Sequence, residues 1–153
     1  MKNILFAASE GVPFIKTGGL ADVVGSLPKC IDKEYYDVRV ILPKYSCMKP
    51  QMQEKLQYIT HFYMDFNWHE EYVGVLGANV DGIQYYFIDN EHYFTGFKPY
   101  GDDVLFEIEK YSYFCKAVLS ALPLIGFQPD IIHCHDWQTG LIPVHLKDKF
   151  AGG

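Results

Sequence analysis

Four residues that could bind a ligand stand together near the start of the chain: Lys16, Thr17, Gly18 and Gly19. Glycines lack a Cβ and let a ligand approach the backbone closely. A helix that begins at this point offers unpaired N–H groups and partial positive charge, to which Lys16 adds a full charge. The group suits a diphosphate, but a glycine-rich turn beside a solvated lysine explains it equally well. It matches neither the dinucleotide fingerprint nor a P-loop.

A second group, H-C-H-D-W, covers residues 133–137. Alternation along a strand places His133 and His135 on one face. We expect His135, at the strand tip, to face a ligand, and His133 to be a hydrogen-bonded core residue. Asp136 is suited to cap the helix that follows. A metal site needs three or four ligands, and because no second cluster supplies them we predict none.

Weaker candidates lie between these two groups. Residues 93–103 are rich in aromatic residues, glycine and proline, which predicts a surface loop whose Tyr93 and Phe94 rings can stack on a sugar or base. Glu107 and Lys110 share one helical stretch, where a solvated face with a local ion pair is the simplest interpretation. No G-x-S-x-G nucleophile elbow is present in the sequence.

The elements around the first group form a β-α-β unit. Residues 3–8 are apolar on both faces, as in a buried parallel strand. Apolar residues then recur at helical spacing from Leu20 to Ile31, with a kink or early end expected at Pro28. Residues 38–42 form the next strand. A helix between two short strands predicts a right-handed crossover and parallel pairing.

The middle of the chain changes character. Residues 56–68, 72–80 and 83–88 alternate as antiparallel strands do, and Asp81-Gly82 is a two-residue hairpin signal. A helix over 104–122, a short strand over 130–134 and a helix reaching about Lys149 complete the pattern. The fold class is therefore α/β, with a doubly wound, mainly parallel sheet and a β-hairpin insertion. Both chemical groups then lie beyond the carboxyl ends of strands, where such sheets bind ligands.

The composition of the chain limits the classes of partner that it is suited to bind. The 153 residues carry a net charge of -6 without a basic block, which favours neither nucleic acid nor an anionic membrane. The four cysteines are scattered, and no secretory signal precedes them, so we expect a cytoplasmic protein with reduced thiols. No apolar stretch approaches the length of a membrane span. The chain stops after a helix where another strand is expected, which indicates a piece of a larger protein.

Four segments together resemble the N-terminal end of bacterial glycogen synthases, the family shared with plant starch synthases. They are residues 1–28, which contain K-T-G-G-L-A-D-V, followed by V-R-V-I-L-P-K-Y, Y-Y-F-I-D-N-E-H-Y-F and P-D-I-I-H-C-H-D-W-Q-T-G-L-I-P. They occur in the family's order and span nearly the whole chain. The resemblance implies that residues 1–153 are the Rossmann-like N-terminal half of a GT-B enzyme whose C-terminal nucleotide-binding domain is absent here.

The resemblance also implies an activity: transfer of glucose from ADP-glucose to the non-reducing end of an α-1,4-glucan (glycogen), with retention and without a metal or other cofactor. On this match Lys16 contacts the donor diphosphate, and Gly18 and Gly19 lie against its phosphate and glucose. Asp22 lies close to the same pocket and His135 near the donor glucose. Tyr93 or Phe94 helps line the nucleotide or glucan side.

The sequence departs from the family at one place. Lys110 stands where arginine is usual, and Glu107 is the nearest match for an acidic residue before it, so the resemblance assigns no role to either. Without its second domain we expect the chain to be inactive alone. Two alternatives stay open: a stand-alone module that binds glucan or nucleotide, and a related GT-B transferase that uses UDP-glucose.

Overall fold

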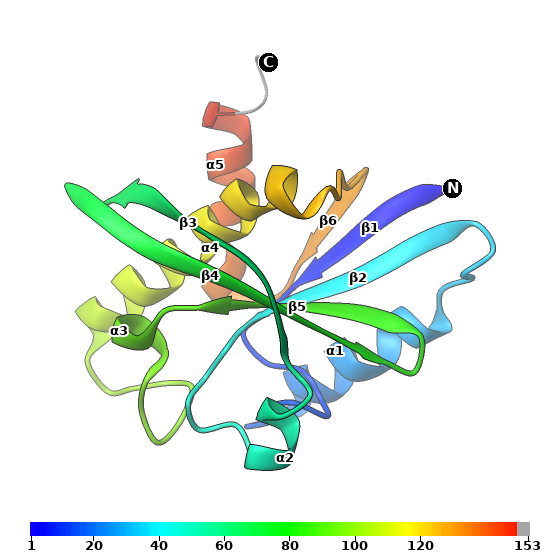
Figure 1. The fold of residues 1–153 in the computed structure, drawn as a ribbon, viewed down its shortest axis with the longest axis horizontal. Coiled ribbons are helices and arrows are strands. Elements are labelled where there is room, and N and C mark those ends of the chain that lie inside the picture. Colours follow the sequence, from blue (N-terminus) through cyan, green and yellow to red (C-terminus); the bar gives the residue numbers. More distant parts are fainter. Residues whose placement is uncertain (150–153) are drawn as a thin grey trace.

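The computed structural model describes residues 1–149, which form one six-stranded sheet with helices on both faces. Figure 1 shows α1 on one side of the sheet and α4 with α5 on the other. This doubly wound arrangement agrees with the predicted α/β class. The elements are β1 (Lys2–Ala7), α1 (Gly19–Cys30), β2 (Tyr36–Pro43), α2 (Pro50–Gln53), β3 (Gln57–Phe66), β4 (His69–Val80), β5 (Ile83–Asp89), α3 (Glu91–Phe94), α4 (Val104–Ile125), β6 (Ile131–Cys134), the one-turn 3-10 helix η1 (Trp137–Thr139) and α5 (Leu141–Lys149).

The strand order is β3-β4-β5-β2-β1-β6. β1 pairs in parallel with β2 and β6, and β2 pairs in parallel with β5. β4 pairs antiparallel with both β3 and β5, so the hairpin insertion extends the sheet at one end. This order places β1 between β2 and β6. The loops after β1 and β6 therefore start side by side at the carboxyl edge.

Apolar residues of the inner strands form the core between the sheet and its helices. In β1, Leu5 and Ala7 are fully buried and Phe6 is almost fully buried, because both faces of this strand are covered. The end strand β3 differs, since its residues are mostly exposed or half-buried and Met64 is its one buried residue. Within residues 1–149, no helix combines the length and apolar character needed to cross a membrane.

The long helix α4 corrects one boundary prediction. It continues through Pro123 to Ile125 instead of stopping at Leu122. Proline removes only one backbone donor, and the helix closes just beyond it at Gly126, whose left-handed conformation (φ 67°) suits glycine. The Gly126 N–H bonds to the Leu122 carbonyl oxygen, so the last turn keeps its hydrogen bonding. In α1, Pro28 likewise lies inside the helix, three residues before Ile31, its C-cap.

Candidate functional site

The loop that follows β1 is fixed by a buried carboxylate. Glu10 is 3% exposed, and its Oε2 accepts hydrogen bonds from the Thr17 backbone N–H (2.7 Å) and the Thr17 hydroxyl (2.6 Å). Gly11 and Ile15 close a tight turn between them through two backbone hydrogen bonds of 3.0 Å. Phe14, at the tip of that turn, is buried against aromatic rings of β5. The segment before α1 is therefore rigidly placed.

Open space surrounds the two glycines at the start of α1. Gly18 is the N-cap in an extended conformation (φ -165°), which any residue can adopt, and a Cβ built at Gly18 or Gly19 meets no atom within 4 Å. Gly25 is different, because its Cβ would lie 2.2 Å from Val12 Cγ2. Packing among the described residues thus explains Gly25 but not Gly18 or Gly19. A ligand seated against the helix start would explain the pair.

Lys16 and Asp22 form an ion pair at the rim of this loop. The Lys16 Nζ lies 2.7 Å from Asp22 Oδ2, and the side chains are 52% and 54% exposed. An ion pair with this exposure contributes little to stability. Lys16 can therefore exchange Asp22 for an anionic ligand at small cost.

His135 lies at the tip of β6, as expected, but in a more buried position than its neighbour. It is 9% exposed, its ring stacks on Phe6 (5.6 Å between centroids), and its Nε2 is buried without a hydrogen-bond partner among the described residues. Burial, and then the nearby His133, lower the pKa of His135. Its imidazole is therefore neutral at neutral pH and able to accept or donate one hydrogen bond.

The expectation that His133 belongs to the core is wrong. His133 is exposed, although its ring lies 4.4 Å from that of His135. β6 is an end strand of the sheet in the described fold, so it has a neighbouring strand, β1, on one edge only. Strand alternation correctly put the two histidines on one face, but it gives no information on whether that face is covered.

Asp136 caps the turn after β6, as predicted. Its Oδ1 accepts the Trp137 N–H (2.8 Å), and the Thr139 hydroxyl donates to the His135 carbonyl oxygen (2.9 Å). Asp136 has φ 64° and ψ -176°, a conformation that is costly for a residue with a side chain. Such strain is concentrated at functional sites, and here it lies directly beside His135.

A buried tyrosine cluster connects the two loops. The Ser9 hydroxyl lies 2.6 Å from Tyr100 Oη, and Tyr45 donates its hydroxyl to the Ser9 carbonyl oxygen (2.7 Å). Tyr45 Oη lies 2.8 Å from Tyr111 Oη, and the Tyr111 ring meets the Trp137 ring edge-on at 5.5 Å. Burial raises the pKa of Tyr45, Tyr100 and Tyr111, so all three stay neutral. The loops after β1 and β6 are thus parts of one site.

Glu107 and Lys110 lie beneath this site, not on a solvated face as expected. Lys110 Nζ is 3.0 Å from Glu107 Oε1 and donates to the Pro99 carbonyl oxygen (2.6 Å). The side chains are 9% and 6% exposed, because the segment before α4 folds over them. Glu107 Oε2 and Gln138 Oε1 are buried without hydrogen-bond partners among the described residues. Together with His135 Nε2, these atoms are free to form hydrogen bonds with water or a ligand.

Tyr93 and Phe94 are not in a surface loop, so that prediction is wrong. They end the short helix α3, where they are 1% and 3% exposed. Asn90 begins this helix by accepting the Tyr93 N–H at 3.2 Å, which turns both rings inward. The Tyr93 ring stacks on Tyr113 (4.6 Å), and its hydroxyl donates to Glu109 Oε2 (3.0 Å). Neither ring is presented to a ligand in this structure.

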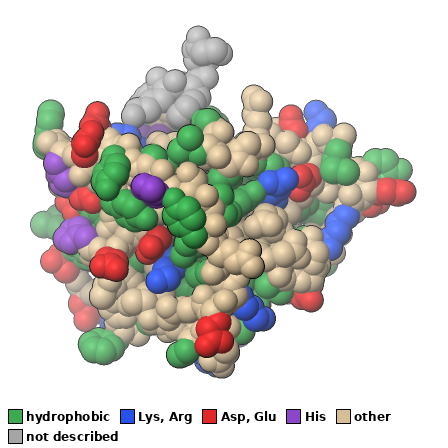
Figure 2. Space-filling view, viewed as in Figure 1, with side chains coloured by type: hydrophobic (Ala, Val, Ile, Leu, Met, Phe, Trp, Pro, Cys, Tyr) green, Lys and Arg blue, Asp and Glu red, His purple; other side chains and the backbone are tan. Residues whose placement is uncertain are grey.

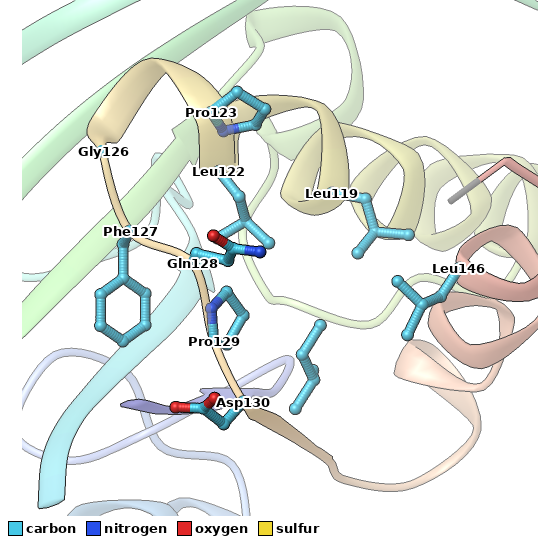
Figure 3. A pocket seen from close by; sticks show the side chains of 10 residues that line it. Leu119, Leu122, Pro123, Gly126, Phe127, Gln128, Pro129, Asp130 and Leu146 are labelled. Carbon is cyan, nitrogen blue, oxygen red and sulfur yellow. The ribbon is translucent and has the colours of Figure 1, made fainter. Parts of the chain in front are cut away.

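A separate apolar cavity of about 630 Å³ lies away from these loops. Figure 3 shows it between the end of α4, the segment leading into β6, and α5. That segment precedes β6, so the cavity is at the amino end of the strand and not at the carboxyl edge. Among the described residues, no group of three or more His, Cys, Asp or Glu side chains is placed to hold a metal ion.

Sequence reasoning missed the residues that assemble the site. Ser9, Glu10, Tyr45 and Tyr100 come from three separate segments, and each makes its contact with a residue distant in the sequence or across a turn. The only available signal was the position of Ser9 and Glu10 directly after a buried strand. Nothing local connects Tyr100 to Ser9, because that contact depends on how the segment before α4 folds back.

Comparison with known proteins identifies the family. The model for the starch synthase catalytic domain matches residues 3–152. This chain belongs to the starch synthase catalytic domain family. Glycogen synthase from Lachnoclostridium phytofermentans is 63% identical over 98% of this chain and 31% of its own length. Glycogen synthase from Lachnospira eligens is 60% identical over 100% of this chain and 32% of its own length. The chain thus spans about a third of these relatives.

A solved structure supports the same assignment. The catalytic domain of starch synthase IV from Arabidopsis thaliana, bound to ADP and acarbose, superimposes with a TM-score of 0.87 at 32% sequence identity. The match covers 99% of this chain and 31% of the plant chain. The predicted fold class, an α/β Rossmann-like half of a GT-B catalytic domain, and the family resemblance are both confirmed.

Proposed function

We propose that this chain is the N-terminal, donor-facing part of a glycogen synthase, which transfers glucose from ADP-glucose to the non-reducing end of an α-1,4-glucan with retention. Relatives that are 60% and 63% identical are glycogen synthases, and the plant neighbour was bound to ADP and acarbose. Reduced cysteines fit the cytoplasm, the location we propose: all four are free in the structure.

The observation that carries this proposal is the open space at the start of α1. Gly18 and Gly19 are adjacent, neither is required by a left-handed conformation, and a Cβ at either would meet nothing. In the proposed complex the donor diphosphate lies against their backbone, where the unpaired N–H groups of α1 point. Lys16 leaves Asp22 and pairs with the diphosphate. These groups stabilise the negative charge of the departing ADP.

His135 takes the glucose side of the site in this proposal. Its buried Nε2 has no partner among the described residues and can bond one sugar hydroxyl. The lowered pKa keeps the ring neutral, so the bond does not add a charge beside the reacting carbon. Asp22, once released by Lys16, can accept a second sugar hydroxyl. The second domain of the longer relatives would close the donor site from the opposite side.

Replacing Lys16 in the full-length enzyme tests the donor loop. We expect Lys16→Ala to lower kcat/KM for ADP-glucose by about 100-fold, the usual effect of losing one group that stabilises developing negative charge. Lys29→Ala is the matched control, because Lys29 forms a comparably exposed 2.7 Å ion pair with Asp81 far from the loop. Unchanged kinetics for Lys16→Ala would exclude the diphosphate contact.

The choice of donor and the need for the second domain require separate measurements. Turnover of ADP-glucose and UDP-glucose by the full-length enzyme, measured with the same glucan, should favour ADP-glucose. A preference for UDP-glucose would support the related transferase instead. The 153-residue chain should show no glucosyl transfer with either donor. Glucan or nucleotide binding without turnover in the full-length protein would support a binding module.

A further inference from the structure

The segment between α3 and α4 runs along the carboxyl edge of the sheet and contacts the loops of other strands there. Residues 95–103, which we call the strap, connect β5, through α3, to the start of α4. The strap first meets the loop after β2, because the Gly96 N–H donates to Ser46 Oγ at 3.0 Å. It then reaches the loop after β1, where Tyr100 Oη lies 2.6 Å from Ser9 Oγ. The strap therefore follows the order β5, β2, β1 of the sheet.

The middle of the strap is anchored to α4 at Pro99. The Pro99 carbonyl oxygen accepts two hydrogen bonds, from Lys110 Nζ at 2.6 Å and from Tyr111 Oη at 2.9 Å. The next residue, Tyr100, places its ring 6.1 Å from that of Tyr111. These contacts fix the position from which the Tyr100 hydroxyl extends to the loop after β1.

Apart from this anchor, the strap has little to hold it closed. Among its residues as the structure describes them, only Pro99 is buried and Tyr100 is half-buried, while the others are exposed. Phe97 is 104% exposed, so even its large apolar side chain packs on nothing. A segment with so little buried apolar surface opens at a small cost in free energy. A single hydrogen bond from Tyr100 is therefore a substantial part of what keeps the strap in place.

The same hydrogen bond acts on the loop between β1 and α1 (residues 8–18, the donor loop). Ser9 is fully buried at the start of this loop, and the next residue, Glu10, accepts both the N–H and the hydroxyl of Thr17 at its end. Burial raises the pKa of Tyr100, and the Ser9 and Thr17 hydroxyls beside it oppose that rise. Tyr100 Oη is thus close to both ends of the donor loop.

The placement of this loop matters because the protein has no general attraction for an anion. The net charge is -6, and Figure 2 shows basic and acidic side chains interspersed on the face in view. Diphosphate binding then depends on how Lys16 and the N–H groups at the start of α1 are placed. We propose that Tyr100 is a positioning residue, whose hydroxyl joins the strap to the donor loop and holds that loop in the conformation that receives the donor diphosphate. The identity of this ligand rests on the proposed function.

Limited digestion of the full-length enzyme with trypsin is the first test. Trypsin cuts after lysine, so cutting between Lys16 and Thr17, identified by mass spectrometry, reports the open donor loop. Tyr100→Phe keeps the ring and removes the hydroxyl. We expect about fivefold faster cutting after Lys16, because the loss of one hydrogen bond raises the open population by about that factor. Cutting after Lys33, which is exposed at the opposite edge of the sheet, should keep its rate unless the whole domain unfolds.

Steady-state kinetics of the same variant are the second test. Apparent affinity falls with the fraction of molecules in the binding-competent conformation. We therefore expect the KM for ADP-glucose to rise about threefold while kcat at saturating donor stays unchanged. A purely structural role for Tyr100 would lower the melting temperature and leave the KM unchanged.

Two further variants isolate the hydrogen bond itself. Tyr113→Phe is the matched control, because buried Tyr113 would lose a comparable bond, 2.7 Å to the Tyr72 carbonyl oxygen, away from the donor loop. It should change neither the cutting rate after Lys16 nor the KM. Ser9→Ala removes the other partner of Tyr100 and should reproduce both changes. The double variant Ser9→Ala/Tyr100→Phe should be affected no more than either single one, since the two share one bond.

Three outcomes would overturn the role of Tyr100. One is equal cutting after Lys16 in Tyr100→Phe and the unsubstituted enzyme; another is faster cutting with an unchanged KM. The third is additive effects of Ser9→Ala and Tyr100→Phe, because the two residues would then act separately. Lys16→Ala judges the diphosphate contact on its own, whereas cutting after Lys16 requires no donor. Failure of the proposed function and failure of this inference are therefore distinguishable.

Discussion

At the rim of the candidate site, Lys16 and Asp22 form an ion pair in which both side chains are about half exposed (52% and 54%). Beneath it, Lys110 and Glu107 form an ion pair whose side chains are only 6% and 9% exposed. Water screens the first pair, so its partners are free to separate when a ligand arrives. The second has lost its water and depends on its internal contacts. Substitutions in the exposed pair at the rim should therefore affect ligand binding. Substitutions in the buried pair beneath it, the floor of the site, should first affect stability.

Glu107→Ala should give the largest effect on stability. Removing this carboxylate leaves the Lys110 ammonium buried without its counter-ion, with the Pro99 carbonyl oxygen and the Tyr111 ring as neighbours, which costs about 3–5 kcal/mol for a broken buried pair. Urea unfolding followed by circular dichroism measures the change. Asp102→Ala is the control, since its side chain is 97% exposed, and its effect should stay within about 0.5 kcal/mol. Equal urea midpoints for Glu107→Ala and Asp102→Ala would contradict the claim that the buried pair contributes to stability.

Gly25→Ala should follow. The new Cβ would lie 2.2 Å from Val12 Cγ2 and 2.9 Å from the Val12 carbonyl oxygen, so α1 or the loop must shift. Overpacking of this kind costs about 1–3 kcal/mol. The measurement is again the urea midpoint. A midpoint at or above that of the unsubstituted chain would show that the loop before α1 gives way without cost.

His135 should make stability dependent on pH. Burial and His133 lower its pKa in the folded state, below the unfolded value of about 6.5. The unfolded chain therefore takes up the proton first as the pH falls, and the stability that the neutral ring contributes is lost below about pH 6.5. Comparing the chain with His135→Gln at pH 7.5 and 5.5 isolates this contribution from other groups. Parallel losses in both proteins would contradict it.

Gly19→Ala should give the smallest change in stability, and in the opposite direction. Alanine is a better helix former than glycine by about 0.5–1 kcal/mol, and nothing within 4 Å opposes the added methyl group. The same methyl group should weaken ADP-glucose binding in the full-length enzyme. For this one variant, thermal unfolding should therefore show a higher stability and donor titration a lower affinity for ADP-glucose. Unchanged donor affinity would mean that no ligand approaches the start of α1.

The elements of the inner sheet were predictable because each depends on a local pattern. The apolar run of β1, the helical spacing of α1 and the Asp81-Gly82 hairpin signal all lie within a few residues, and the structure has each of them. For the same reason Asp136 was correctly predicted as a cap, since the capping bond joins adjacent residues. Family membership followed from motifs that are likewise continuous in the sequence.

The errors concern burial that distant segments decide. His133 is exposed on an end strand, which alternation cannot reveal. Tyr93 and Phe94 turn inward because Asn90 starts a helical turn within a stretch that reads as a loop. Glu107 and Lys110 carry charges typical of a solvated face, but the segment containing Pro99 covers them. In each case the deciding contact is tertiary.

The central position of β1 has a consequence for synthesis of the chain. β1 is made before β6, one of its two neighbours, and Asn3 bonds Asp130 across 127 positions. At about 5–20 residues per second, a ribosome needs roughly 6–25 s to supply that neighbour. Until then one edge of β1 has no strand beside it and is open to pairing with other chains. Chaperones that hold nascent chains would therefore find their target in β1.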